Sequence, residues 1–433
     1  MAETLQLFVG NIVHCEKPYE VSSLEKGFVA LKGNKIVSVG DATSLANFRA
    51  TIEVKYNILE YILKDSQVLI PGLIDTHVHA CQYSNVGLGM DLKVVPWLWE
   101  HTFPLELKCK DIEYSRRCYD AVVKKALDYG TTTASYNAAI YTDSALVLAD
   151  SVIKHGQRAL VGKVNHTRQG PDYYVETHKE FIDETRRFIE EIQKKKSSLV
   201  QAIITPRSPT CSDLENMELL IGLGKEFGLR VQTHLKESLE GFKVFTTPPV
   251  KNPNCKTKIF PKKTIYAHCV HLSEEEIQAL VNSESTVSHC PNSNVNLRSG
   301  ICDVRALIKA GIHVGLGTDV SGGCSLSLMN AMRYAVACSN FLSFGKDNYE
   351  PIGWRDAFYM ATLGGAKVLD LDKEIGNFEV GKEFDAVIID MNVKDGPIDY
   401  LEDCSALETL QKFIYAGDDR NVVSVYVAGR KVK

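Results

Sequence analysis

The sequence His77-Val78-His79 is the stretch of this chain with the clearest capacity for chemistry. It follows two short apolar runs, residues 68–70 and 73–74, separated by a Pro-Gly break. Side chains two residues apart on a strand share a face, so the two imidazoles are expected side by side at a strand end. Such a pair suits zinc among other metals and supplies half of a metal site. A bare His-x-His also occurs as a hydrogen-bonded pair, so the rest of the chain must decide.

Other residues of suitable type follow strand-like segments further along: Arg207, His234, Glu237, His268 and Asp319. Three imidazoles and a carboxylate can hold one divalent ion and leave room for water, as a catalytic zinc site requires. The ion lowers the pKa of that water, and a proton carrier belongs beside it. Glu237, three residues after His234, suits that role. Each residue alone has a structural explanation, but their joint occurrence at strand ends favours catalysis.

Strands and helices alternate through the middle of the chain and would position these residues. Beside the opening strand that ends at His79, seven segments are predicted as strands: 131–136, 159–164, 200–205, 230–234, 264–268, 286–289 and 313–319. Eight strand–helix units predict an α/β fold of the (β/α)₈ TIM-barrel type, with the active site at the C-terminal ends of the strands. A doubly wound open sheet would need a phosphate-binding glycine loop after its first strand, and there is none.

Three helices between these strands have clear sequence signals. Residues 175–195 carry apolar side chains at helical spacing. Asp213 opens a second helix, which we expect to end at Gly222 or Gly224. Ser273, followed by three glutamates, caps a third. The remaining histidines near strands, His271, His289 and His313, are interpreted as packing or supporting residues.

Both ends of the chain are rich in predicted strands: 5–10, 27–31, 35–40, 384–389 and 422–429. Lys32-Gly33-Asn34 suits a hairpin turn. We therefore expect a small β-sandwich domain built from residues 1–66 and 380–433, and a catalytic barrel over residues 67–379. Residues 245–254 and the lysines that follow, up to Lys263, are expected as a surface loop.

Composition sets broad limits on function. The 433 residues are 45% hydrophobic and 24% charged, with a formal net charge of -5, which gives no reason to expect nucleic acid or an anionic membrane as partner. No apolar run approaches membrane-spanning length, and the start lacks the features of a signal peptide. The twelve cysteines include no C-x-x-C pair and are expected as reduced thiols. We therefore expect a cytoplasmic protein.

The spacing of these motifs resembles the amidohydrolase superfamily: His-x-His after strand one, then His, His and Asp after strands five, six and eight. The resemblance extends across nearly the whole chain. Residues 71–82, 97–106 and 205–207 are similar to the guanine deaminases of that superfamily. Residues 288–294 and 317–319 are shared more widely, with its other deaminases and chlorohydrolases.

The resemblance implies zinc-dependent hydrolysis of guanine by water to xanthine and ammonia, in a homodimer with one zinc ion per subunit. One ion is expected because Thr205-Pro206-Arg207 stands where binuclear relatives carry a modified lysine. The implied zinc ligands are His77, His79, His234 and Asp319. The implied catalytic residues are Glu237, which carries a proton to the purine, Asp319, which accepts one from water, and His268, which orients water and substrate. The implied substrate-contacting residues are Gln82, Arg207, Ser208, His234, Glu237, His268 and Asp319.

Two residues depart from the family pattern. Ser208 stands where an aromatic usually follows the arginine, and it would form one wall of the purine pocket. His101 stands where a tyrosine is more usual. Arg207 donates hydrogen bonds only, which suits the carbonyl O6 of guanine and not the amine of adenine, while Gln82 both donates and accepts.

Three alternatives to guanine deamination stay open at this point. Another deaminase or chlorohydrolase of the superfamily would act on a thioadenosine, cytosine or a triazine, and Gln82 and Arg207 argue against it. The cytidine-deaminase-type zinc fold needs a Pro-Cys-x-x-Cys motif, and the chain contains no Pro-Cys dipeptide. A non-catalytic scaffold would be expected to have lost the ligands or Glu237, and all of them are present.

Overall fold

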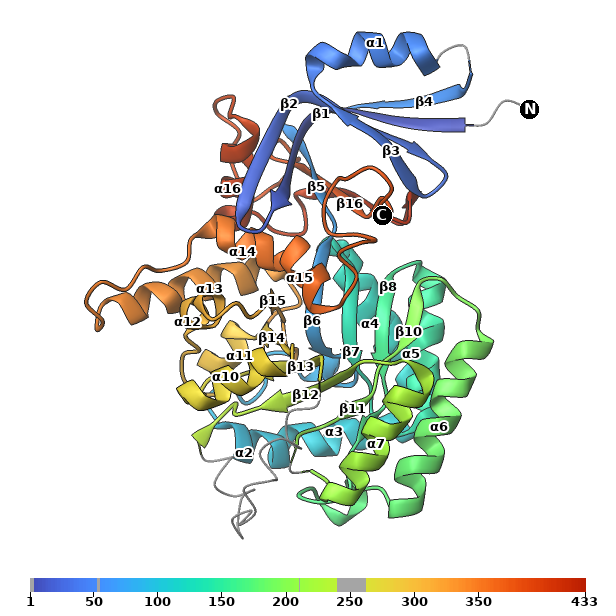
Figure 1. Cartoon of the computed structure of the whole chain (residues 1–433), viewed down its shortest axis with the longest axis vertical. Helices are drawn as coiled ribbons and strands as arrows, with labels where there is room; N and C mark the ends of the chain where they lie inside the picture. Colours follow the sequence, from blue (N-terminus) through green and yellow to red (C-terminus); the bar gives the residue numbers. More distant parts are fainter. Residues whose placement is uncertain (1–3, 53–54, 210, 240–261) are drawn as a thin grey trace.

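The computed structural model describes residues 4–52, 55–209, 211–239 and 262–433. Parallel strands with helices outside them make up its larger part (Figure 1). A second sheet, built from both ends of the chain, lies against one end of these strands. No helix in the described ranges is long and apolar enough to cross a membrane.

The parallel strands form three hydrogen-bonded groups. The first group is β6 (Leu73–His79), β7 (Thr131–Asn137), β8 (Arg158–Gly162) and β10 (Val200–Ala202). The second is β9 (Val164–Asn165) with β11 (Thr205–Pro206). The third is β12 (Val231–Leu235), β13 (Thr264–His268), β14 (Thr286–His289) and β15 (Val314–Leu316). Every pairing within the groups is parallel.

Backbone contacts connect the three groups into a barrel-like ring. Ile204 forms a parallel bridge with Val231, which joins the end of β10 to β12. On the other side, the N–H of Asp319 donates to the carbonyl of His77 at 2.9 Å, so the segment after β15 lies beside β6. The eight predicted strand positions therefore follow one another round the ring, in agreement with the (β/α)₈ prediction.

Two of the eight predicted strands are each split in two. Residues 159–164 form β8 and β9, and residues 200–205 form β10 and β11. Lys163 interrupts the first of them, and its buried ammonium forms an ion pair with the buried carboxylate of Glu176.

Helices cover the outside of the parallel strands (Figure 1). The longer ones are α4 (Ile112–Asp128), α5 (Thr142–His155), α6 (His178–Lys194), α7 (Leu214–Phe227), α10 (Glu274–Asn282), α13 (Leu328–Ser343) and α14 (Trp354–Ala361). Shorter ones are α2 (Val94–Trp97), α3 (Phe103–Leu107), α11 (Pro291–Asn296), α12 (Val304–Lys309) and α15 (Leu363–Val368).

The three helices predicted from the sequence are all present. In α6, Thr177 and Glu180 form a capping box, and Ser273 and Glu276 form another at α10. The predicted end of α7 at Gly222 or Gly224 is wrong. The helix continues to Phe227 and ends at Gly228, whose φ of 66° is the left-handed conformation that glycine adopts at little cost.

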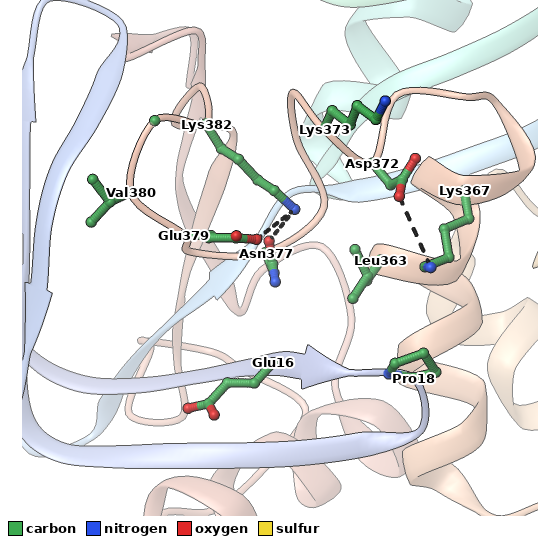
Figure 2. Close-up of a pocket in the computed structure, with 11 residues that line it drawn as sticks. Glu16, Pro18, Leu363, Lys367, Asp372, Lys373, Asn377, Glu379, Val380 and Lys382 are labelled. Carbon is green, nitrogen blue, oxygen red and sulfur yellow. Dashed lines mark hydrogen bonds and ion pairs between the residues drawn. The ribbon is translucent and has the colours of Figure 1, made fainter.

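Helix α15 closes the end of the ring where the strands begin. Its residues Ala366 and Val368 pack in an apolar cluster with Ile74 of β6, Leu160 of β8 and Ile265 of β13. Beside α15 a cavity of about 490 Å³ opens toward the end of β1 (Figure 2). Four of the charged residues on its wall form two ion pairs: the ammonium of Lys382 lies 3.2 Å from Glu379, and that of Lys367 lies 4.0 Å from Asp372.

Both ends of the chain contribute to one eight-stranded sheet, which agrees with the prediction of a sheet built from both termini, while the β-sandwich form of this domain stays a prediction. From the N-terminal side come β1 (Thr4–Lys17), β2 (Glu20–Lys32), β3 (Lys35–Gly40), β4 (Asn57–Ile62) and β5 (Gln67–Pro71). From the C-terminal side come β16 (Ala386–Asp390), β17 (Val422–Val427) and β18 (Arg430–Lys431), joined through the antiparallel pair β5–β16. Helices α1 (Ala42–Ile52) and α16 (Ala406–Ala416) also belong to these two segments.

The core of this sheet is aromatic. The fully buried ring of Phe8 lies 4.6 Å from that of Tyr61, 4.8 Å from Phe384 and 5.1 Å from Tyr426, measured between centroids. Residues from both ends of the chain thus share one core. The division into a domain of residues 1–66 with 380–433 and a barrel of residues 67–379 stays a prediction. The predicted loop at 245–254 lies outside the described residues.

Candidate active site

The chemically capable residues lie where the parallel strands end. His77 and His79 end β6, His234 is the penultimate residue of β12, and His268 ends β13. Asp319 follows β15 by three residues. Arg207 comes directly after β11, and Glu237 two residues after β12. The fold therefore brings together residues that are far apart in sequence.

Three imidazole nitrogens and one carboxylate oxygen converge on one point. Nε2 of His234 lies 3.2 Å from Nε2 of His77 and 3.0 Å from Nε2 of His79. Oδ1 of Asp319 lies 3.2 Å from Nε2 of His77 and 3.4 Å from Nε2 of His79. All four atoms are within 4.8 Å of one another.

This donor set fits a divalent metal ion. Nδ1 of His234 lies 2.6 Å from the carbonyl oxygen of Arg207, which only accepts, so Nδ1 carries the proton and the Nε2 lone pair faces the cluster. Burial holds the pKa of His79 at about 3 and lowers the pKa of His77 and His234 as well. Burial opposes ionisation of Asp319, but nearby His268 and His77 hold its pKa below the ordinary value. Neutral imidazoles beside a carboxylate are metal ligands in their binding protonation states.

A second cluster lies next to the first and shares Asp319 with it. Nε2 of His268 is 3.9 Å from a carboxylate oxygen of Glu237 and 3.8 Å from Oδ2 of Asp319. Its Nδ1 donates to Oδ1 of Asn294 at 2.8 Å, and its buried Nε2 has no hydrogen-bond partner among the described residues. These three groups therefore face one another closely enough to share a bound water or a proton.

The ionisable groups of the second cluster have shifted pKa values. Burial raises the pKa of Glu237, which brings the carboxyl closer to the range where it can both take and release a proton near neutral pH. Burial would lower the pKa of His268, but the carboxylates of Glu237 and Asp319 raise it above its ordinary value. The arrangement can therefore hold and move protons beside the donor cluster.

Asp75 links the strand that carries His77 and His79 to the segment that carries Asp319, and the sequence reasoning missed it. Its Oδ1 accepts the backbone N–H of His77 at 3.2 Å and that of Thr318 at 3.1 Å, and the Thr318 hydroxyl donates to its Oδ2. Its place two residues before His77, in the apolar strand, is the signal that was available. A buried carboxylate in such a strand needs partners of this kind.

The backbone turns sharply at two site residues. His268 has a φ of 72° and Asp319 a φ of 47°, a region that non-glycine residues seldom occupy. Such a conformation costs on the order of 1–3 kcal/mol and is typical of functional sites.

Arg207 and Gln82, predicted to contact the substrate, meet at a carboxylate that the sequence reasoning did not single out. Nη1 and Nη2 of Arg207 donate to Glu106 at 2.8 and 3.2 Å, and Nε2 of Gln82 donates to Glu106 at 2.7 Å. The Arg207 guanidinium also lies over the ring of Phe103, 5.1 Å from its centroid. The signal for Glu106 was its place within residues 97–106, one of the motifs used for the family resemblance.

Ser208 and His101 stand at the two departures from the family pattern. Ser208 is partly buried, and its backbone N–H donates to the sulfur of Cys211 at 3.2 Å. Its role as a pocket wall stays a prediction. His101 packs against Gly89, where an added Cβ would lie 2.5 Å from Cδ2 of His101, so the absence of a side chain allows this close approach.

The three histidines interpreted from the sequence as packing or supporting residues lie outside the donor cluster. His289 ends β14 and is buried, and burial lowers its pKa to about 3. Nε2 of His271 lies 2.7 Å from the carbonyl oxygen of Ser299. His313 is exposed at the start of β15. None of them belongs to either group of candidate metal ligands found among the described residues.

Comparison with known proteins is consistent with this geometry. Residues 68–432 match the model of the amidohydrolase family. A guanine deaminase from Dictyostelium discoideum is 39% identical over 99% of this chain and 98% of its own length. The guanine deaminase of Homo sapiens is 43% identical over 86% of this chain and 84% of its own length. The crystal structure of a guanine deaminase from C. acetobutylicum, with guanine bound in its active site, superimposes with a TM-score of 0.88 at 33% identity and covers 99% of this chain and 100% of that one.

Proposed function

This chain belongs to the amidohydrolase family, and we propose that it is a guanine deaminase, hydrolysing guanine to xanthine and ammonia. The observation that carries the proposal is the convergence of three neutral imidazoles with Asp319, beside Glu237 and Arg207, at the ends of the parallel strands. That arrangement provides for water activation, proton transfer and recognition of a carbonyl oxygen in one place.

The proposed metal is a single zinc ion held by His77, His79, His234 and Asp319. Three nitrogens and one oxygen within 4.8 Å of one another are donors that zinc prefers, and they support this choice. When bound, the ion supplies a water molecule of lowered pKa. The hydrogen bond from His234 to the carbonyl of Arg207 keeps one of these donors correctly oriented.

The proposed reaction is addition of water to C2 of guanine followed by loss of the 2-amino group. Asp319 accepts a proton from the attacking water, and Glu237 carries one to the ring nitrogen beside C2. His268, with Nε2 between these two carboxylates, orients water and substrate. The proton held by Asp319 then passes to the 2-amino group, the carbon–nitrogen bond breaks and the amine leaves as ammonia. The hydroxyl proton at C2 returns to Glu237, so the oxygen of water ends in xanthine and both carboxyl groups are restored.

Substrate selection in this proposal rests on Arg207. Its guanidinium only donates hydrogen bonds, so it suits the O6 of guanine, whereas the 6-amino group of adenine would leave it unpaired. Arg207 is buried, and this makes an unpaired donor costly.

The test is the ultraviolet absorbance of guanine incubated with zinc-loaded protein, with adenine, cytosine and methylthioadenosine in parallel. We expect guanine to be replaced by xanthine and the other three to remain unchanged. Turnover of another base without turnover of guanine would leave the metal site in place and reject the assignment of substrate. Protein in which zinc binding has been abolished by His77→Ala with His79→Ala serves as the matched control.

Two further expectations accompany this function. We propose a cytoplasmic location, which is supported by the free thiols of the described cysteines. We also propose a homodimer, and sedimentation analysis of the purified protein tests it: a single species of the mass of one chain would reject it.

A further inference from the structure

Glu106 is a carboxylate buried in the pocket region that the proposed reaction does not use. It lies on α3, accepts four hydrogen bonds from residues outside that helix, and has no exposed surface. Two donors come from Arg207 and one from Gln82, and the Tyr174 hydroxyl supplies another. Both carboxylate oxygens are therefore occupied by protein groups.

The carboxylate fixes which way the amide of Gln82 points. Nε2 of Gln82 donates to Glu106, while its Oε1 accepts the backbone N–H of Ser321 at 3.2 Å and the Ser321 hydroxyl at 3.4 Å. An ionised carboxylate only accepts and a backbone N–H only donates, so the amide cannot be reversed without losing both contacts. Gln82, expected from its residue type both to donate and to accept, is thus left with one free N–H to offer a substrate.

The same carboxylate holds the guanidinium of Arg207 in one plane. The bidentate contact uses one N–H on each terminal nitrogen, and the ring of Phe103 lies under the group. Burial would raise the pKa of Glu106, but the charge and hydrogen bonds of Arg207 lower it to about 2, so the pair is ionised at neutral pH. The positive charge of Arg207 is thereby balanced next to the site proposed for a dipositive ion.

We propose that Glu106 is the positioning residue that sets the specificity of this site, by fixing Arg207 and Gln82 as paired hydrogen-bond donors for an uncharged purine with acceptor atoms on its edge. This role of Glu106 rests on the proposed function, whose substrate specificity it would determine. Glu106 has no exposed surface and acts through Arg207 and Gln82. The O6 atom of a 6-oxo purine can accept hydrogen bonds from the donors that Glu106 positions. A purine without O6 cannot form these hydrogen bonds.

The experiment compares Glu106→Gln with the unchanged zinc-loaded protein on two purines. Guanine is assayed by turnover, and 2-aminopurine, which keeps the 2-amino group and lacks O6, is assayed by its competition with guanine. In the variant the amide retains the shape but loses the charge that orients Arg207. We expect kcat/KM for guanine to fall about 10- to 100-fold, mostly through KM, while the competition constant of 2-aminopurine changes less than about threefold.

The matched control removes a similar ion pair at the other end of the parallel strands. Arg158, at the start of β8, contacts Asp385 through two nitrogens at 3.1 and 3.2 Å, and both residues are buried. Asp385→Asn should lower the melting temperature. It should leave unchanged the ratio of kcat/KM for guanine to the competition constant of 2-aminopurine. Glu106→Asp, which keeps the charge, should retain more of the guanine specificity than Glu106→Gln.

The outcomes separate this inference from the proposed function. If the unchanged protein fails to convert guanine, the proposed function and the inference both fail. If it converts guanine and the folded Glu106 variants keep the guanine to 2-aminopurine ratio, or the Asp385 control shifts it equally, only the inference is overturned. A selective loss of guanine in Glu106→Gln, with partial recovery in Glu106→Asp, supports it.

Discussion

The carbonyl oxygen of Arg207 lies 2.6 Å from Nδ1 of His234, so the backbone of a pocket residue orients an imidazole of the donor cluster. The side chain of the same Arg207 turns to Glu106. One residue therefore contacts the proposed metal site through its backbone and the proposed substrate pocket through its guanidinium. The two contributions can be separated by mutation, because a side-chain substitution keeps the carbonyl.

Arg207→Ala should lose substrate recognition and keep the metal. Loss of charged hydrogen bonds predicts a fall in kcat/KM for guanine of about 100-fold. Zinc content should stay at one ion per chain, because the contact to His234 is a backbone contact. Arg186→Ala, which removes an exposed ion pair with Glu226, is the control and should leave both quantities unchanged. Loss of zinc from Arg207→Ala would contradict this division of roles.

Glu237→Gln should retain zinc and lose turnover. The amide cannot carry a proton, and general acid–base groups typically contribute about 10²- to 10⁴-fold to the rate. Glu237 is not one of the four residues whose ligand atoms converge at the proposed zinc site. The metal content measured on the same sample should therefore not change. A variant that keeps its zinc and most of its kcat would remove Glu237 from the proposed mechanism.

The strands and the donor cluster could be predicted because their signals are local. His77 and His79 share a face through the two-residue period of a strand, and the other donors follow apolar runs of strand length. The end of α7 was mispredicted because glycine inside a helix costs only about 1 kcal/mol, which packing can offset, so Gly222 and Gly224 do not stop the helix and Gly228 does.

Glu106 and Asp75 show what the sequence could not provide. Glu106 and Arg207 are 101 residues apart, and nothing in their spacing indicates that they form an ion pair. Asp75 reaches Thr318 across 243 residues. Contacts of this kind depend on how the strand ends are placed in the folded ring, and a single sequence holds no periodic trace of them.

The buried imidazole of His166 should make the protein less stable in acid. Burial, then the charge of Arg207, lowers its pKa to about 3 from the 6.5 of an exposed histidine. As pH falls below 6.5 the unfolded chain binds a proton that the folded chain does not, so this contribution to stability is full above 6.5 and is lost progressively toward pH 3. Between pH 7 and pH 5 the loss from His166 is about 2 kcal/mol.

Urea unfolding of the protein and of His166→Gln at pH 7 and pH 5 measures this difference. Between pH 7 and pH 5, the free energy of unfolding of the unchanged protein should fall by about 2 kcal/mol more than that of His166→Gln. Equal pH dependence in the two proteins would show that His166 titrates in the folded state as it does in the unfolded one.

Phe8→Ala should destabilise the terminal sheet without changing the chemistry. Its ring is fully buried among Tyr61, Phe384 and Tyr426, so truncation should cost about 3–5 kcal/mol of unfolding free energy. Phe344→Ala, at a ring that is 79% exposed, is the control and should cost less than about 0.5 kcal/mol. With guanine as substrate, kcat of folded Phe8→Ala should equal that of the unchanged protein; a large fall in kcat would couple this sheet to the site.

We propose that a metal ion at His77, His79, His234 and Asp319 enables hydrolysis of guanine, and this proposal can be tested on the purified protein. Its most direct test removes metal with a chelator and returns zinc in steps, measuring bound zinc and conversion of guanine to xanthine on the same samples. We predict no turnover in the metal-free protein and a rate that rises linearly and levels off at one zinc per chain. Full turnover without metal, or untouched guanine in fully loaded protein, would contradict the account.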